Sequence, residues 1–317
     1  MGYRFALEAT LSQPMTLPKI TAAQLGAAFP QLENVGTPRP GGQKLVFPCK
    51  LAGVKYAVKV LRCQQFDAAH TTSETMPLDV DYARAKREVA ILQACNSHYL
   101  PKIGPLELTE FPHDGDRLLA FSEEFIEGPN LEELLARSGP LTEPEAIRLA
   151  SNIVTAIAEL WRLNKIHRDI KPANIMRRNL DGSYVLLDPG IAFDLVDGTL
   201  TAEGCIPHSP GYIAPEHTNP ARKREADVRA DLFLLGISLY EAVTGTHPFR
   251  ERVNQSPVEI IQNILRKTPI TPRARRREVS VGFSQLVMRL LEKKRHMRFR
   301  SCDHLQEALL KIEGASS

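Results

Sequence analysis

One stretch near the middle of the chain carries side chains that could organise a divalent cation. Residues 167–174 read His-Arg-Asp-Ile-Lys-Pro-Ala-Asn, and a second acidic position follows at Asp188. Mg²⁺ prefers carboxylate, amide and phosphate oxygens, so Asp169, Asn174 and Asp188 could serve it without a cage of histidine or cysteine. A His-Arg-Asp triplet alone is as readily a charged surface loop, so the interpretation depends on the residues around it.

Two further blocks place this stretch in a pattern. Residues 188–190 read Asp-Pro-Gly, and residues 214–216 read Ala-Pro-Glu. In this order the three blocks resemble the catalytic loop, metal-binding turn and peptide-docking anchor of eukaryotic-type (Hanks-type) serine/threonine protein kinases of the bacterial kind. The resemblance implies an α+β, bilobal protein-kinase-like fold with a small β-rich N-lobe and a larger helical C-lobe.

The resemblance also assigns roles for phosphoryl transfer, in which a protein supplies positioning and electrostatics rather than covalent catalysis. Asp169 would accept or orient the proton of the substrate hydroxyl, and Lys171 would bridge that carboxylate and the γ-phosphate as a point charge. Asn174 would share a metal ion with Asp188. The implied cofactors are ATP and Mg²⁺, with Mn²⁺ as an alternative. Lys171 is typical of members that act on serine and threonine.

The metal-binding turn departs from the family pattern at one position. Pro189 stands where members usually carry a phenylalanine whose ring packs under the helix with the paired glutamate. Proline has a fixed φ and a smaller apolar surface, so we expect a functional metal site with a stiffer, less switchable turn. This departure leaves a nucleotide-binding pseudokinase or regulatory binding module as an alternative to an active kinase.

Upstream, one lysine lies inside a strand pattern and one glutamate inside a helix pattern. Residues 56–61 alternate as a half-buried strand around Lys59, and residues 83–92 are helix-prone around Glu88. By the resemblance, Lys59 would hold the α- and β-phosphates of ATP, and Glu88 would pair with it. The polar stretch between them, residues 64–81, is expected to form a surface loop.

The phosphate-covering loop is the weakest match to the family. Residues 39–46 align with its G-x-G-x-x-G-x-V pattern, but only Gly41 and Val46 match, and basic residues replace the other two glycines. Gly42 still lets the backbone approach a phosphate, and Lys44 would not repel one. On these residues alone, a Gly-Pro turn between strands is the better interpretation.

The resemblance further implies the contacts of the adenine ring. They are the backbone groups of Glu124 and Ile126 at its edge, Val46 and Ala57 as floor and roof, and Met176 as a further nucleotide contact. Glu123 falls at the position that gates the back of this pocket in the family. A carboxylate at a buried position needs a partner or water.

The third block points to a protein substrate. In the family, a hydroxyl such as that of Ser209 lies against the catalytic aspartate and lysine, Glu216 pairs with a buried arginine that aligns with Arg298, and Asp231 binds the catalytic-loop backbone. An aspartate at a helix start is otherwise an ordinary N-cap. Small-molecule phosphotransferases, a second alternative, are not expected to combine these features with the Thr-His-Pro-Phe turn at residues 246–249.

Regulation by phosphorylation is implied by Arg168. An arginine beside the catalytic carboxylate goes, in the family, with an activation segment whose phosphate it binds. Thr199 and Thr201 are the nearest free hydroxyls in the variable part of that segment. The alternative is that Pro189 already holds the turn and the enzyme is constitutively active.

Composition sets the domain organisation. The chain has 317 residues, 43% of them hydrophobic, and we expect an N-terminal extension (1–35, with a short helix at 21–29), a kinase domain (36–312) and a tail (313–317). The N-lobe would span about 36–126 and the C-lobe about 127–312. Five cysteines without metal spacing are expected to be reduced thiols.

Partners and location follow from charge and hydropathy. The formal net charge of +3 indicates no nucleic-acid partner, and the basic clusters at 273–277 and 293–298 are interpreted as solvated faces or as patches for an acidic partner. No run of about 18 apolar residues predicts a membrane span, so a cytoplasmic protein is expected. The expected partners are ATP and protein substrates, with a homodimer for trans-autophosphorylation.

Overall fold

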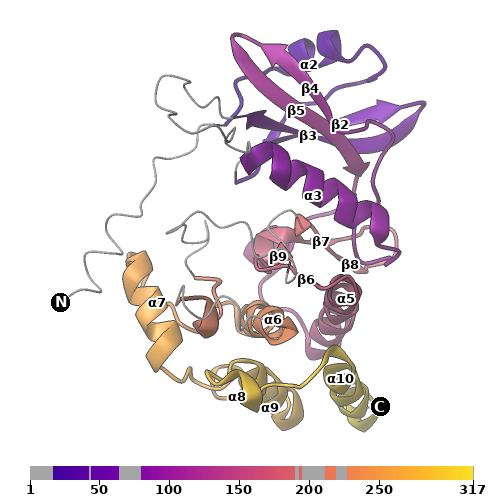
Figure 1. The fold of residues 1–317 in the computed structure, drawn as a ribbon. Coiled ribbons are helices and arrows are strands. Elements are labelled where there is room, and N and C mark those ends of the chain that lie inside the picture. The colour runs from indigo at the N-terminus through magenta and orange to yellow at the C-terminus, as the bar shows by residue number, and fades with distance from the viewer. Residues whose placement is uncertain are drawn as a thin grey trace, which may run out of the picture. The chain divides into compact units, whose positions relative to one another are not determined.

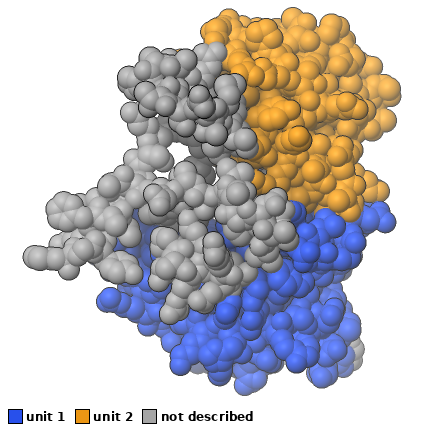
Figure 2. Space-filling view, viewed as in Figure 1, with its two compact units in different colours: residues 1–11, 96–100, 126–317 blue, residues 12–95, 101–125 orange. Residues whose placement is uncertain are grey.

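The computed structural model describes residues 17–42, 44–63, 80–189, 193–194, 211–218 and 227–316 (Figure 1). The chain forms two compact units, residues 12–95 with 101–125 and residues 96–100 with 126–317 and 1–11 (Figure 2). Gly190, Thr199, Thr201 and Ser209, which are discussed above, lie outside the described part, as do Gln43 and one of the five cysteines, Cys205. Most of the expected loop at 64–81 lies there too, while residues 80 and 81 already belong to a helix.

A five-stranded antiparallel sheet is the frame of the first unit, with strand order β1-β2-β3-β5-β4. Its strands are β1 (Arg39–Pro40), β2 (Lys44–Leu51), β3 (Val54–Cys63), β4 (Thr109–His113) and β5 (Asp116–Glu124). Two-residue turns join β2 to β3 and β4 to β5. In both turns the two residues have positive φ, 49° and 77° at Ala52 and Gly53, 48° and 81° at Asp114 and Gly115. Such turns match the right-handed twist of the strands that they connect.

Both faces of this sheet are covered, which explains why its central strands are apolar on both sides. One face packs on the short helix α2 (Ala22–Ala28), where Leu25 and Phe29 join Phe47 and Val58 in one cluster. The Thr21 hydroxyl and the Gln24 side chain cap that helix reciprocally. The helix expected at 21–29 is therefore present, and it contributes to the core of this unit.

Helix α3 (Val80–Ala94) covers the other face of the sheet. Its Ala85 lies in a cluster with Leu61 and Phe121. Side chains two residues apart on a strand share a face, so Lys59 points to the same side as Leu61. The register of β3 therefore aims the candidate phosphate-binding lysine at the helix that carries Glu88.

The second unit is mainly helical. Its helices are α4 (Leu131–Ser138), α5 (Glu143–Arg162), α6 (Val228–Thr244), α7 (Pro257–Arg266), α8 (Pro272–Arg275), α9 (Val281–Leu290) and α10 (Cys302–Ser316). Helix α6 is buried along nearly its whole length, as expected for a helix that is apolar all round. A Cβ at Gly236 would lie 2.7 Å from the Leu290 Cβ, so the glycine permits the close approach of α6 and α9.

Short elements of the second unit carry the candidate site. They are the strands β6 (Lys165–Ile166), β7 (Ile175–Arg177), β8 (Tyr184–Leu186) and β9 (Phe193–Asp194), and the 3₁₀ turns η2 (Pro172–Asn174), η4 (Pro215–Thr218) and η6 (Arg295–Met297). A β-rich unit and a helical unit confirm the expected α+β kinase-like fold class. No helix among the described residues has both the length and the apolar composition needed to cross a bilayer.

Candidate active site

A hairpin brings the two candidate metal ligands to the same end of β7 and β8. The strands pair with Ile175 opposite Leu186, and the Asn174 carbonyl accepts the Leu187 N–H at 2.8 Å. Asp188 follows directly, with φ of 64°. A left-handed conformation costs a non-glycine residue energy and persists only where its surroundings enforce it. The hairpin register thus places Asp188 beside the end of the loop that begins at His167.

The carboxylate of Asp169 lies at the centre of a hydrogen-bonded group. Its Oδ2 accepts from Lys171 Nζ and from Asn174 Nδ2, both at 2.8 Å. Asn174 Nδ2 also donates to the Asp169 carbonyl at 2.8 Å, which fixes the orientation of the amide. The amide nitrogen is therefore committed to Asp169, and the amide oxygen is the group of Asn174 that a metal ion could bind.

His167 links the catalytic loop to the strand before Asp188. The Asp169 N–H donates to Nδ1 at 3.3 Å, so the other ring nitrogen carries the proton and donates to the Leu187 carbonyl at 2.9 Å. The ring is fully buried. The ring of His167 thus connects the backbone of Asp169 to the backbone of Leu187, the residue before Asp188, through two hydrogen bonds.

Asp231 anchors the same loop from helix α6. Its carboxylate accepts the backbone N–H of His167 at 2.7 Å and of Arg168 at 2.8 Å. Arg168 has φ of 68°, and these two hydrogen bonds stabilise that conformation. Burial raises the pKa of Asp231, while the charge of Arg168 and the two backbone N–H donors oppose the shift. The binding of the catalytic-loop backbone that the resemblance implied for Asp231 is present.

The residues present fit a hard divalent cation that is shared with phosphate oxygens. Asn174 offers an amide oxygen and Asp188 a carboxylate, the donor types that Mg²⁺ accepts. Among the described residues, no cluster of three or more His, Cys, Asp or Glu side chains could hold a metal by itself. Such a site would therefore be completed by ligands from a nucleotide and from water.

Lys59 is the centre of the candidate site in the first unit. Its Nζ lies 2.6 Å from Glu88 Oε1 on α3 and 2.6 Å from Glu123 Oε2 on β5. The residue is only 1% exposed. The expected contact between Lys59 and Glu88 is present, and the expectation that Glu123 is paired is met by the same lysine.

Lys44 is a fourth charged member of this group. Its Nζ lies 3.6 Å from Glu88 Oε1, and its side chain is 11% exposed. Sequence reasoning treated Lys44 as a substitute for a glycine and did not foresee its contact with the paired glutamate. Two lysines and two carboxylates make the group formally neutral, which limits the cost of burying Glu123.

The pairing of β2 and β3 determines where several of the other residues expected to contact the nucleotide lie. Val46 pairs directly with Lys59 across β2 and β3, so the two side chains share a face with Ala57. The Gly41 N–H donates to the Lys44 carbonyl at 2.8 Å and closes a tight turn beside Gly42.

A backbone hydrogen bond limits the contacts with adenine that were expected of Glu124 and Ile126. The Glu124 N–H donates to the Lys102 carbonyl at 2.7 Å, so this N–H is not available to an adenine edge. Ile126 is buried. In the second unit, Met176 on β7 forms a β-bridge with Asn130.

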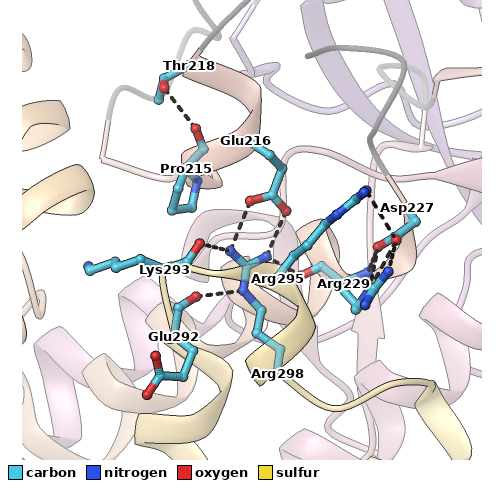
Figure 3. A network of polar contacts seen from close by, with 9 residues as sticks. All are labelled: Pro215, Glu216, Thr218, Asp227, Arg229, Glu292, Lys293, Arg295 and Arg298. Atoms are coloured by element: carbon cyan, nitrogen blue, oxygen red, sulfur yellow. Dashed lines mark hydrogen bonds and ion pairs between the residues drawn. The ribbon is translucent and has the colours of Figure 1, made fainter.

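A buried ion pair fixes the Ala-Pro-Glu segment to the C-terminal part of the helical unit (Figure 3). Arg298 donates from its two terminal nitrogens to the Glu216 carboxylate at 2.7 and 2.9 Å. It also donates to the carbonyls of Glu292, Arg229 and Lys293. Burial raises the pKa of Glu216, but the Arg298 hydrogen bonds outweigh it and the pKa lies below its usual value. The expected partner of Glu216 is thus in place.

The segment before this pair is held by two contacts that sequence reasoning did not name. His247 Nε2 donates to the Gly211 carbonyl at 2.9 Å, because its Nδ1 accepts the Phe249 N–H at 3.1 Å. The Tyr212 hydroxyl donates to the Glu241 carboxylate on α6. Only the Thr-His-Pro-Phe motif pointed to His247, and no local signal pointed to Glu241.

The basic clusters do more than face solvent. Arg276 donates to the Leu141 carbonyl at 2.6 Å, Arg275 donates to the Tyr240 hydroxyl at 2.8 Å, and Arg273 donates to the Val279 carbonyl at 2.8 Å. In the second cluster Arg298 is buried and Lys293 Nζ lies 3.8 Å from the centre of the Phe249 ring. Most of the first cluster is exposed, as expected of a solvated face, whereas Arg298 in the second cluster is buried.

The protein kinase domain family matches residues 35–310, nearly the whole chain. The chain belongs to this family. Among curated proteins, it is 33% identical over 198 residues to the serine/threonine-protein kinase pkn3 of Myxococcus xanthus, covering 59% of this chain and 35% of that protein. It is 29% identical over 257 residues to the serine/threonine-protein kinase PknB of Mycobacterium leprae, covering 81% of this chain and 38% of that protein.

The relatives are much longer than the region that they share with this chain. The matched region spans little more than a third of the length of pkn3 and PknB. Both relatives carry names of serine/threonine-protein kinases, so neither the small-molecule phosphotransferase nor the regulatory binding module is favoured.

Proposed function

We propose that this kinase domain transfers the γ-phosphate of ATP to serine or threonine hydroxyls of proteins, its own chain included. The observation that carries the proposal is the group around Asp169. Its carboxylate is held by Lys171 and Asn174 at 2.8 Å, and its loop is anchored by Asp231. A positioned carboxylate of this kind orients a hydroxyl proton, and an adjacent lysine stabilises the charge of the transferred group.

The proposed metal is Mg²⁺, with Mn²⁺ as a substitute, held by Asn174 and Asp188. When bound, it would neutralise charge on the phosphates. Lys59 would hold the α- and β-phosphates, with Glu88 as its counter-ion. The contact of 2.6 Å between the two side chains supports this assignment, because a lysine held by one carboxylate is not lost to solvent.

The proposed nucleotide contacts are those that the family resemblance implied. They are Gly41, Gly42, Val46, Ala57, Glu124, Ile126 and Met176. The shared face of Val46, Ala57 and Lys59 supports the first part of this set. We place the reaction in the cytoplasm, where ATP is available, and the thiols of Cys49 and Cys302, which form no disulfide, agree with that.

The deciding experiment incubates the purified chain with Mg-ATP and a protein substrate and maps phosphorylated residues by mass spectrometry. Asp169→Asn should lower the rate about 10²- to 10⁴-fold, the range for loss of a general base. Asp188→Ala should abolish the metal-dependent rate while the fold is retained. Asp114→Asn, at an exposed hairpin turn, is the matched control and should leave the rate unchanged. Equal rates in wild type and Asp188→Ala would refute the metal assignment.

A further inference from the structure

A concave surface on the helical unit has three cationic side chains among the seven residues that line it. It lies between α9, the start of α10 and the segment that joins them, and its volume is about 440 Å³. Helices α9 and α10 are neighbours at the C-terminal end of this unit (Figure 1). The residues that line it are Arg289, Phe299, Arg300, His304, Glu307, Ala308 and Lys311. None of them belongs to the candidate active site.

The three cations of this surface are not held in direct ion pairs by the described part of the protein. Arg289, Arg300 and Lys311 form no ion pair and no side-chain hydrogen bond with other described residues. This contrasts with the arginines at 273, 275 and 276, which bond to the protein itself. Because the three cations around this concavity outnumber its one carboxylate, Glu307, the surface favours an anionic ligand.

Arg289 is also preorganised. Its guanidinium carbon lies 4.2 Å from the centre of the Phe299 ring, and Phe299 is buried. A guanidinium held flat against an aromatic ring loses less conformational freedom when it binds, and its planar fork suits two oxygens of one group. His304 is fixed as well, since its Nδ1 lies 2.7 Å from the Ser301 hydroxyl.

The charge and size of the surface indicate the ligand class. Two arginines, one lysine and one glutamate leave a surplus of two positive charges. A phosphoserine or phosphothreonine carries about −1.5 to −2 at neutral pH, which matches that surplus better than one carboxylate does. The volume exceeds what a phosphate group fills and leaves room for the flanking peptide. A nucleic acid would need a longer cationic stripe.

We propose that this surface binds a phosphorylated serine or threonine in a peptide segment and so docks phosphorylated proteins on the kinase domain. Arg289 and Arg300 would bind the phosphate oxygens, and Lys311 would contribute charge at its edge. Glu307 would reject segments with acidic residues on its side. The proposal extends the proposed function, because the ligand has the chemistry of that reaction's product.

Binding to the full chain can be measured without ATP, so the result does not depend on whether the chain is an active kinase. The probe is a fluorescein-labelled peptide library with phosphothreonine at one fixed position, read by fluorescence polarisation. Unphosphorylated and glutamate-substituted libraries are the comparison probes. We expect the phosphorylated library to bind at least about tenfold more tightly than either, given the strength of charge-assisted hydrogen bonds.

Variants locate the site and separate it from general charge effects. Arg300→Ala and Lys311→Ala should each weaken binding several-fold, and Glu307→Gln should strengthen it. Arg266→Ala removes the same charge from the exposed end of α7 and should change nothing. Hydrogen exchange should show protection at α9 and α10 when the peptide is bound. Equal affinity for the three libraries, or loss of binding in Arg266→Ala equal to that in Arg300→Ala, would overturn the proposal.

Discussion

Lys59 brings a positive charge into an interior where two carboxylates meet it. Glu88 and Glu123 each lie 2.6 Å from its Nζ, and Lys44 approaches Glu88 at 3.6 Å. One carboxylate is enough to hold a lysine in place, so the second competes with any phosphate that would bind it. The second carboxylate at Lys59 therefore affects how tightly the phosphates of a nucleotide are bound.

Replacing Glu123 by glutamine should strengthen the binding of ADP several-fold, because it removes the competing charge while keeping the shape. Binding of adenosine should not change, since adenosine has no phosphate. Isothermal titration with both ligands measures the difference. Glu107→Gln removes the same charge at an exposed position before β4 and is the control. Equal losses of ADP and adenosine binding in Glu123→Gln would show that the residue acts only through the fold.

Replacing Lys59 by methionine should lower turnover at least about a hundredfold, the usual cost of losing one charged group that stabilises a transferring phosphoryl group. The initial rate of peptide phosphorylation is the measurement. Lys55→Met, at an exposed position of the same strand, should have little effect. If Lys59→Met retained nearly normal activity, Lys44 or Lys55 would have to supply the charge.

At the scale of elements, contacts remote from the chemistry hold the docking segment in place. Arg298 binds Glu216, the carbonyls of Glu292 and Lys293 between α9 and η6, and the carbonyl of Arg229 at the start of α6 (Figure 3). The turn after α6 holds Gly211 through His247. The position of a peptide substrate would depend on these two anchors.

Replacing Arg298 by alanine should lower the free energy of unfolding by about 3 to 5 kcal/mol, because Glu216 would remain buried without its counter-ion. Urea denaturation followed by circular dichroism measures this loss. Arg300→Ala, two residues later at an exposed position, should leave the midpoint unchanged. A loss below about 1 kcal/mol in Arg298→Ala would mean that Glu216 finds another partner.

His247 should make the docking segment sensitive to acid. Burial lowers the pKa of His247 to about 4, although the hydrogen bond to Gly211 opposes the shift and Arg250 adds to it. The unfolded chain binds this proton near pH 6.5. The stabilisation is therefore complete above about pH 6.5 and is lost as the pH falls towards 4.

Measuring the free energy of unfolding at pH 7.5 and at pH 4.5 tests whether stability falls with pH in this direction. His247→Gln should make the difference between these two free energies of unfolding smaller by about 2 to 3 kcal/mol, as follows from the two pKa values. His217, whose pKa burial also lowers to about 4, should retain its own share in that variant. An unchanged pH dependence in His247→Gln would exclude His247 as the sensitive group.

At the scale of the whole molecule, the question is what switches the kinase on. Burial lowers the pKa of Arg168 to about 10, while Asp231 opposes the shift, so the guanidinium remains charged at neutral pH. A charged arginine next to Asp169 can bind a phosphate carried by another part of the chain. Thr199 and Thr201 are the proposed carriers of that phosphate.

Replacing Thr199 and Thr201 by alanine should lower activity and remove phosphate from this segment, as judged by mass spectrometry. Mixing wild type with Asp169→Asn tests phosphorylation between copies, since phosphate on the inactive chain can come only from an active one. Thr268→Ala, at an exposed position after α7, is the control. Equal rates for wild type and the double variant, without phosphate on the segment, would favour a constitutively active enzyme.

The sequence by itself determined the family, the order of the motifs and the α+β class. These are properties of contiguous residues. Asp169, Lys171 and Asn174 lie within six consecutive residues. Because they are so close along the chain, their residue types and spacing are enough to predict that their side chains meet. The short helix at 21–29 could also be predicted, because its cap and its apolar positions are local.

Only the tertiary structure decided which partners meet across long separations. Glu123 reaches Lys59 because the register of β3 and β5 puts Ala57 opposite Glu123 and Lys59 opposite Phe121, and nothing in either strand alone sets that register. His247 reaches Gly211 because a turn packs on a distant segment. The uncompensated cations between α9 and α10 became visible only in the fold, since sequence shows charges but not the distances between them.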